Sequence, residues 1–307
     1  MNRYIGKRLV ETLIVLLLMS MVVFSLSRLT GDPVSLLLSD YASDQDRARV
    51  TAELGLDKPI VEQYVNFLKN ASRGDFGQSL MGDQRPALEM VLERLPASLQ
   101  LAATAFLFSL LLGIPLGVLA AAKHGTYWDV LARLLALIGQ SVPAFWLGLV
   151  LMFLFSVKLA WLPTSGYGGW RHFVLPVLTL GLFTASAVTR LIRNTMLDVL
   201  TSDYIKLARL KGLPEGLVIW KHALRNSLIP MITFMGTFFA TMITGAVVVE
   251  TVFSWPGIGR LAFEAILNRD FPLIQAVVLL MTTLFIVINL LVDISYALID
   301  PRIRLSN

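Results

Sequence analysis

Cysteine is absent from the 307-residue sequence, and histidine occurs only three times. Without cysteine the chain can form no disulfide, zinc–thiolate site, iron–sulfur cluster or cysteine nucleophile. His124, His172 and His222 are far apart in the chain, and no carboxylates stand beside them at the spacing of metal ligands. We therefore expect no metal site and interpret the histidines as ordinary loop residues.

Sequence patterns of hydrolytic chemistry are also absent. No Gly-x-x-x-x-Gly-Lys-Ser/Thr stretch occurs, so the chain lacks the phosphate-binding loop that ATP hydrolysis requires. Neither a Gly-x-Ser-x-Gly nor a His-Glu-x-x-His stretch is present to support a hydrolase. We expect that the protein is not an enzyme, that it binds no cofactor, and that any ATP and Mg²⁺ are used by partner subunits.

Charge is scarce as well, because only 15% of residues are charged while 56% are hydrophobic. A soluble domain uses about a quarter of its residues as Asp, Glu, Lys and Arg. This chain therefore cannot cover a water-facing surface, and we interpret it as a membrane protein. Its net charge of +5 lies in loops between apolar runs rather than on a stripe or tail, which argues against nucleic acid as a partner.

Six apolar runs are long enough to cross a hydrocarbon layer of roughly 30 Å as helices. They cover residues 9–29, 97–122, 130–157, 173–192, 228–249 and 273–299. The runs are continuously apolar and lack the alternation of membrane strands, so helices are expected rather than a barrel. The predicted fold class is an all-α polytopic membrane protein with six transmembrane helices.

Positive residues, which are retained in the cytoplasm, set the expected orientation. With six spans, one side of the membrane receives Arg3, Lys7, Arg8, Lys123, Arg133, Arg190, Arg193, Lys206, Arg209, Lys211, Lys221, Arg225, Arg302 and Arg304. Both termini and the loop at 193–227 are therefore expected in the cytoplasm. Acidic residues outnumber basic ones in the long segment 30–96, which is expected outside the cell.

Three segments follow: the N-terminus with the first span at 1–29, an extracytoplasmic insertion at 30–96, and a five-helix core at 97–307. Spacings such as Ile60, Tyr64 and Phe67 predict helices within the insertion. The insertion is either a passive cap over the membrane or a docking surface or gate for whatever arrives from outside.

The 193–227 loop contains a short predicted helix from Tyr204 to Lys211, with Ser202 or Asp203 as its N-cap and Gly212 and Pro214 ending it. Such a short helix is marginal in water without packing. The side chains at 204, 207, 208 and 211 fall near one face, and the small Ala208 would permit close approach to a groove in another protein. Alternatively, the positive charges hold the loop at anionic lipid headgroups.

Polar and helix-weakening residues inside the spans are few. Pro143 is expected to kink the third span beside Gln140 and Ser141, where a kinked helix can line a cavity. Asn289 and Asp293 lie in the sixth span, either on a substrate path or, for Asp293, as a structural partner of a nearby arginine. Glycines are expected to allow close helix packing at Gly113, Gly117, Gly236 and Gly245.

The 203–213 run and the following His222-Ala223-Leu224-Arg225-Asn226-Ser227-Leu228-Ile229-Pro230 resemble the EAA loop of bacterial ABC-importer permeases. The likeness is to the first permease subunit of the dipeptide, oligopeptide, glutathione and nickel subgroup. It extends over nearly the whole chain through Gly31-Asp32-Pro33, Gly74-Asp75-Phe76-Gly77, Trp255-Pro256-Gly257-Ile258-Gly259, Asn268-Arg269-Asp270 and the run from Ile299 to Arg304. One departure is that Lys206 and Leu207 replace the Glu and first Ala of the family pattern.

The resemblance implies an inner-membrane permease subunit whose 204–211 helix is the coupling helix, bound in a groove of an ATPase. It assigns ATPase coupling to Asp203, Tyr204, Lys206, Leu207, Ala208, Arg209, Lys211 and Gly212. It further implies a second homologous permease, two ATPase subunits and an extracytoplasmic substrate-binding protein. Separately, the polar residues inside the spans suggest a translocation pathway at Gln140, Ser141, Pro143 and Asn289.

The cargo expected from the resemblance is a short peptide, with nickel, a metallophore, glutathione or an opine as alternatives. A different class also fits the spans: an ion-coupled secondary transporter that uses Asn289 and Asp293 and needs no ATPase. A membrane scaffold without transport is the third possibility, against which the kinked segment at 140–143 stands.

Overall fold

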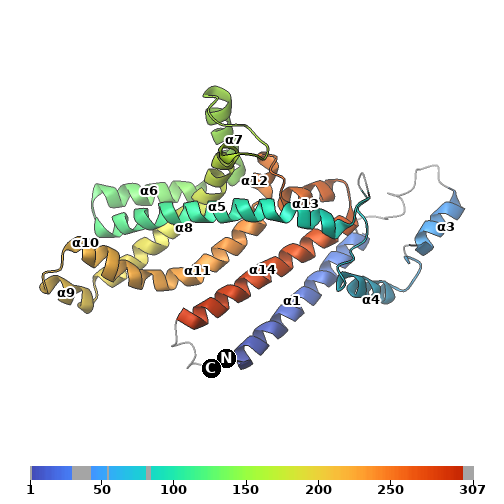
Figure 1. Cartoon of the computed structure of the whole chain (residues 1–307), viewed down its shortest axis with the longest axis horizontal. Coiled ribbons are helices and arrows are strands. Elements are labelled where there is room, and N and C mark those ends of the chain that lie inside the picture. Colours follow the sequence, from blue (N-terminus) through green and yellow to red (C-terminus); the bar gives the residue numbers. More distant parts are fainter. Residues whose placement is uncertain (1, 30–42, 54, 81–83, 300–307) are drawn as a thin grey trace. The chain divides into compact units, whose positions relative to one another are not determined.

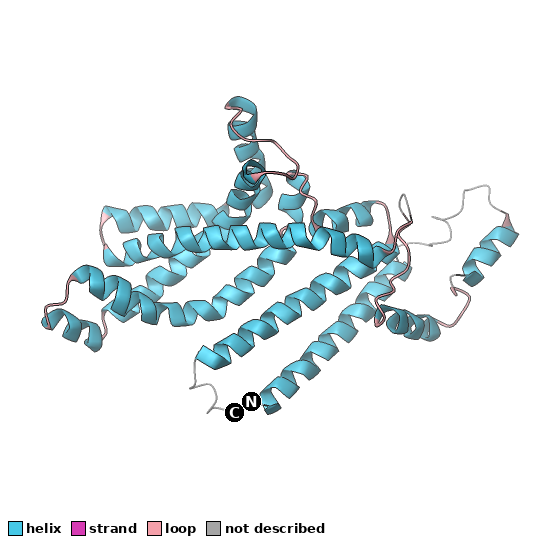
Figure 2. Ribbon diagram, in the orientation of Figure 1, coloured by secondary structure: helices cyan, strands magenta, loops and turns pink. Residues whose placement is uncertain are grey.

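The computed structural model describes residues 2–29, 43–53, 55–80 and 84–299. Within these ranges the regular elements are helices, and Gln78 and Pro86 form an isolated bridge (Figure 2). Figure 1 labels most of them along the chain. The elements are α1 Asn2–Leu29, α3 Asp44–Glu53, α4 Ile60–Ala71, α5 Ala87–Ala122, α6 Tyr127–Ser141, α7 Ala144–Met152, the π-helix η1 Phe153–Lys158, α8 Trp170–Leu200, α9 Asp203–Leu210, α10 Glu215–Leu217, the π-helix η2 Val218–Ala223, α11 Leu224–Gly245, α12 Val247–Val252, α13 Ile258–Leu267 and α14 Phe271–Ile299.

Among the described residues, five helical segments are long and apolar enough to cross a membrane, and a bent pair brings the number to six if it counts as one span. The predicted fold class is therefore confirmed. Two helices extend beyond their apolar runs. The helix α5 begins ten residues before the predicted start of the second span, and α8 continues to Leu200, beyond the predicted end of the fourth. The helices predicted inside the insertion are also present, as α3 and α4. The expected Gly31-Asp32-Pro33 feature and the chain end after Ile299 lie outside the described residues.

The third predicted span is broken rather than kinked. α6 ends at Ser141, Val142 is extended with ψ 124°, and α7 starts after Pro143 at an angle of 101° to α6. Proline has no backbone N–H and its ring clashes with the preceding helical turn, which ends a helix that could otherwise continue. Residues 130–157 are thus two shorter helical pieces, the second of which ends in the π-helix η1.

The helices form two compact units, one of Met1–Pro96 with Gly257–Val287 and the other of Ala97–Pro256 with Ile288–Asn307. In the first unit, a core that includes Ala87, Val91, Ile258 and Leu273 joins the start of α5 to α13 and α14. Because these units group helices by packing and not by side of the membrane, the segments expected at 1–29, 30–96 and 97–307 stay a prediction.

In the first unit, Asp270 links the end of the insertion to the start of α14. Its buried carboxylate accepts hydrogen bonds from the Ser79 hydroxyl and from the backbone N–H groups of Leu80, at 3.0 Å, and Leu273, at 3.2 Å. A carboxylate at a helix N-terminus satisfies free N–H groups and interacts favourably with the helix dipole. Asp270 therefore stabilises both the N-terminus of α14 and the loop that precedes α5.

In the second unit, α5 packs on α8 at two glycines, as expected. A Cβ at Gly113 would lie 2.7 Å from the carbonyl oxygen of Ala185, and one at Gly117 would lie 2.7 Å from that of Thr189. A Cβ at Gly236 would come still closer to the side chain of Val292. Gly245 is different, because within the described residues no atom outside its own helical turn lies within 4 Å of its Cβ position. The expectation that Gly245 allows close packing is therefore wrong.

This difference between glycines yields a first prediction. Gly113→Ala should lower the free energy of unfolding by about 1–3 kcal/mol, since the new methyl group meets a backbone carbonyl that cannot turn away. Gly245→Ala is the matched control and should leave stability unchanged or slightly raised, because alanine is the better helix former. Thermal unfolding of both purified variants in detergent measures the effect. Equal stability of the two variants would contradict the close packing of α5 on α8.

Candidate functional site

The short helix α9 lies between α8 and η2 and packs on a core of the second unit. Ile205 has no exposed surface, and Ala208 keeps only 9% of its surface exposed. The same core contains residues of α5, α8, η2 and α11: Val118, Ala121, Val188, Ile192, Met196, Val218, Ala223 and Met231. An eight-residue helix that is marginal alone is thus stabilised by tertiary packing.

The ends of α9 agree with the prediction within a residue, but the expected capping bond is not formed. Ser202 occupies the N-cap position, yet its hydroxyl donates to the carbonyl of Val199 and makes no capping bond. Ser202 is therefore the N-cap residue, as predicted, but it supplies no capping hydrogen bond. Gly212 ends the helix as predicted, with φ +76°, a left-handed conformation that glycine adopts without strain. Pro214 is the N-cap of the next helix, α10.

The exposed side of α9 carries two leucines. Leu210 is 84% exposed and Leu207 is 52% exposed, and Lys206 and Lys211 beside them are also exposed. Ala208 instead faces the core of its own chain, so the expectation that its small side chain lies at an external groove is corrected. Buried Ile205 and Ala208 hold one side of α9, and the opposite side presents an apolar pair between positive charges.

Polar contacts fix α9 to the following segment. The Asn226 amide donates to the Tyr204 hydroxyl at 2.8 Å and to the His222 carbonyl at 3.0 Å. Arg209 forms two hydrogen bonds with Glu215 of α10, the shorter at 2.6 Å. These bonds from the Arg209 guanidinium lower the pKa of the Glu215 carboxyl below its usual range. The Tyr204–Asn226 bond thus joins the two ends of the 203–226 segment, and the Arg209–Glu215 pair joins α9 to α10 across the turn at Gly212.

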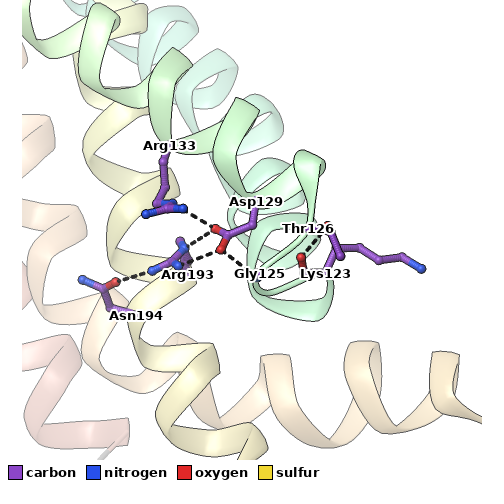
Figure 3. A network of polar contacts seen from close by, with 7 residues as sticks. All are labelled: Lys123, Gly125, Thr126, Asp129, Arg133, Arg193 and Asn194. Carbon is purple, nitrogen blue, oxygen red and sulfur yellow. Dashed lines mark hydrogen bonds and ion pairs between the residues drawn. The ribbon is translucent and has the colours of Figure 1, made fainter.

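A second polar network links α6 to α8 at the buried Asp129 (Figure 3). The Arg193 guanidinium donates to both carboxylate oxygens of Asp129, at 2.7 and 3.0 Å. The backbone N–H of Gly125 adds a bond at 3.1 Å, and the more exposed Arg133 approaches to 3.3 Å. Two parallel bonds from one guanidinium are strong and geometrically specific.

Sequence reasoning missed this network. From the sequence, Arg133 and Arg193 were considered only as positive charges that set the orientation in the membrane, and Asp129 was given no role. One signal was available, since Asp129 is the only acidic residue between Lys123 and Asp198. A single carboxylate among apolar residues requires a charged or hydrogen-bonding partner, although the sequence does not say which arginine it is.

The residues expected on a translocation pathway lie in two places. Gln140, Ser141 and Pro143 are at the break between α6 and α7, where the Ser141 hydroxyl donates to the Leu137 carbonyl of its own helix. Asn289 is half-buried on α14. The side chain of Asp293, the alternative path or structural residue, is outside the described part of the structure. The pathway role of these residues stays a prediction.

The histidines are not all loop residues, contrary to expectation. His172 is in the first turn of α8 and His222 is in η2, whereas His124 is in the turn after α5. Among the residues that the structure describes, no group of three or more His, Asp or Glu is placed to hold a metal ion. The described residues thus form helices long and apolar enough to span a membrane, and the short helix α9 packs on them with its other side exposed.

Comparisons with known proteins define the class. Residues 113–305 match the family described as binding-protein-dependent transport system inner membrane component, and residues 1–102 match the N-terminal part of such membrane components. The chain therefore belongs to this family: it is an ABC-importer permease of the bacterial inner membrane, and its family consists of transport permeases rather than enzymes. Such permeases work with ATPase and substrate-binding partners.

Among individual proteins, the chain is 43% identical to the glutathione transport system permease protein GsiC of Salmonella typhimurium and 41% identical to that of Escherichia coli K12. Both alignments cover 99% of each chain. Solved structures share the fold. The inward-facing MetNI methionine ABC transporter gives a TM-score of 0.62 at 16% identity, covering 72% of this chain and all of the other. An amino acid ABC transporter gives 0.52 at 14% identity, covering 70% and 94%.

The Asp129 network yields a second prediction. Asp129→Asn should lower the free energy of unfolding by about 3 kcal/mol, because it leaves the Arg193 guanidinium poorly solvated and without its charged partner. Arg133→Gln is the matched control on the same carboxylate. Its side chain is 54% exposed, so its loss should cost less than about 1 kcal/mol. Denaturant unfolding of the purified variants in detergent measures both.

A combined variant separates the two contributions. Replacing Asp129 by Leu and Arg193 by Met together should recover stability relative to Asp129→Asn alone, because no unpaired charge is left in the packed interface. If the single Asp129→Asn variant were as stable as Arg133→Gln, the pair would contribute no more than a surface contact.

Proposed function

We propose that this chain forms, with a second homologous permease, the translocation pathway of an importer for short peptides of the size of glutathione. Two ATPase subunits would supply the energy, with ATP and Mg²⁺ bound by them and not by this chain. An extracytoplasmic binding protein would deliver the cargo. The proposed orientation has both termini and α9 in the cytoplasm, which the distribution of positive residues supports.

The coupling part of the proposal rests on the geometry of α9. Leu207 and Leu210 are exposed on a helix whose opposite side is buried, and a stable water-facing helix has no need of two leucines there. An amphipathic helix that presents spaced apolar side chains fits a groove in another protein. Lys206 and Lys211 flank the leucines and suit an acidic rim. An ATPase subunit is the partner that such a permease requires.

The packing of α9 suggests how motion would reach the spans. Ile205 and Ala208 share a core with residues of α5, α8 and α11, so a displacement of α9 acts directly on three long helices. We infer that closure of the ATPases on ATP draws the two coupling helices together, and that the spans then switch from an inward-facing to an outward-facing arrangement. Coupling is reciprocal in its binding free energies, so the loaded binding protein should favour the ATP-bound state.

The substrate class rests on similarity to proteins named as glutathione permeases, at 43% identity over nearly the full chain. Glutathione is a tripeptide, so this similarity agrees with a short-peptide cargo. Nickel, a metallophore and an opine are the remaining candidates, since the binding protein contributes most of the selection. The glutathione-sized peptide is the cargo that the sequence relationship favours.

A third prediction tests the coupling surface. Leu210→Glu should reduce ATP-dependent uptake by at least about tenfold, because a charge in an apolar groove loses the contact and costs more than 1.4 kcal/mol in desolvation. Because Leu210 is 84% exposed in the isolated chain, membrane insertion and thermal stability should stay normal. Uptake by the reconstituted complex and co-purification of the ATPases are the measurements.

Gly216→Glu is the matched control. It places the same charge on the same loop, at a position where a Cβ meets no atom within 4 Å, and should leave uptake and ATPase co-purification unchanged. If Leu210→Glu transported as well as the control, docking through α9 would be excluded.

A fourth prediction concerns energy source and cargo. Proteoliposomes that contain both permeases, the ATPases and the binding protein should take up glutathione or a tripeptide only with ATP inside and binding protein outside. Titration of the purified binding protein with tripeptides, glutathione and Ni²⁺ identifies the cargo. Uptake by this chain alone, driven by an ion gradient without ATP, would instead show a secondary transporter. Tight binding of Ni²⁺ but not of peptides would contradict the peptide class.

A further inference from the structure

The helix α4 of the insertion is strongly amphipathic. At 100° per residue its apolar side chains fall within an arc of about 160°. This arc consists of Ile60, Val61, Tyr64, Val65, Phe67, Leu68 and Ala71, and the opposite side consists of Glu62, Gln63, Asn66, Lys69 and Asn70. An arc this wide exceeds the stripe that one neighbouring helix can cover.

Two aromatic residues of this arc pack on α1. The rings of Tyr64 and Phe67 lie 5.4 and 5.6 Å from the ring of Phe24 in α1. The Tyr64 hydroxyl is 2.9 Å from the Ser20 hydroxyl and 3.3 Å from the Leu17 carbonyl oxygen. Figure 1 shows α4 beside the C-terminal half of α1. The two helices are in the same compact unit.

These contacts fix the depth of α4. The apolar span of α1 runs from Val10 to Arg28, a rise of about 27 Å. Leu17 and Ser20 are near the middle of this span, so the Tyr64 hydroxyl lies at mid-span depth. Phe24 is four residues, or about 6 Å, from the Arg28 end. The side chains of Tyr64 and Phe67 therefore lie below the level at which the α1 span ends, whichever way α1 is oriented.

Three further residues of the arc are largely uncovered by the described part of the chain. Ile60, Val61 and Val65 are 61%, 70% and 55% exposed. Within the span of α1, the apolar Leu18 and Met21 are likewise 57% and 58% exposed. Apolar side chains exposed in the middle of a membrane span face acyl chains unless another protein covers them.

We propose that α4 is an interfacial membrane helix whose Ile60, Val61 and Val65 insert among the acyl chains of the bilayer. Its polar side, with Glu62 and Lys69, faces the headgroups and water. Amphipathic helices of this kind lie in the membrane plane with the apolar face about 5–10 Å below the headgroup boundary, which matches the depth of Phe24. The insertion is thus held by lipid as well as by α1 and is not a purely aqueous cap.

The absence of cysteine makes the test direct. Single variants Val61→Cys and Val65→Cys, in the complete transporter reconstituted in phospholipid vesicles, carry a nitroxide label. Power-saturation EPR compares collisions with oxygen, which concentrates in the hydrocarbon, and with a water-soluble nickel chelate. The labels at 61 and 65 should show high oxygen and low nickel accessibility, as at Met21→Cys in α1. Glu62→Cys and Lys69→Cys on the polar side should show the reverse.

Two results would overturn the proposal. Nickel accessibility at 61 and 65 equal to that at 69 would place α4 in water. Low accessibility to both reagents at 61 and 65 would show that protein covers this side, either the second permease or the binding protein. ATP-dependent uptake by the labelled complexes is recorded in parallel, so a failure of the transport proposal stays separate from a failure of this one.

Discussion

The burial of Ile205 and Ala208 in the core of the second unit is the interaction on which the proposed coupling site depends. Eight residues cannot hold a helix in water by themselves, and the N-terminus of α9 has no side-chain cap. Apolar contact with α5, α8 and α11 supplies what local structure lacks. It also sets which residues of α9 stay outside, so the stability of the helix and the identity of its free surface have one cause.

The features that the sequence predicts well are those that a short stretch of chain decides by itself. Apolar runs of about 20 residues predict the membrane helices because the bilayer sets their length. The missing N–H of Pro143 predicts an interruption there, although the break is sharper than the expected kink. Gly212 is equally local, since its positive φ needs no neighbour. The extension of α5 and α8 beyond their apolar runs is not local, because the extra turns pack on protein.

What the sequence could not supply is the choice of partner. Helical spacing puts Ala208 near Tyr204, but only the position of η2 and α8 shows that Ala208 faces inward. Asp129 needs a cation, and Arg133, four residues away, is the local candidate; the stronger partner is Arg193, 64 residues later. Ser202 follows a standard cap pattern, yet its hydroxyl bonds backward to Val199. Each of these cases concerns a contact between segments distant in sequence or the choice of one hydroxyl between donating to a carbonyl and accepting from a backbone N–H.

The corner between α6 and α7 limits where this chain can meet lipid. A 15-residue helix such as α6 rises about 22 Å, short of the roughly 30 Å of hydrocarbon, so a helix upright in the bilayer would end within it. Peptide groups freed at such an end find no hydrogen-bond partner in oil. The corner must then be shielded by protein, whether by α8, which packs on both α6 and α7, or by a neighbouring subunit, or be wetted from one side. It marks the stretch of this permease least compatible with the annular lipid that surrounds the assembled transporter.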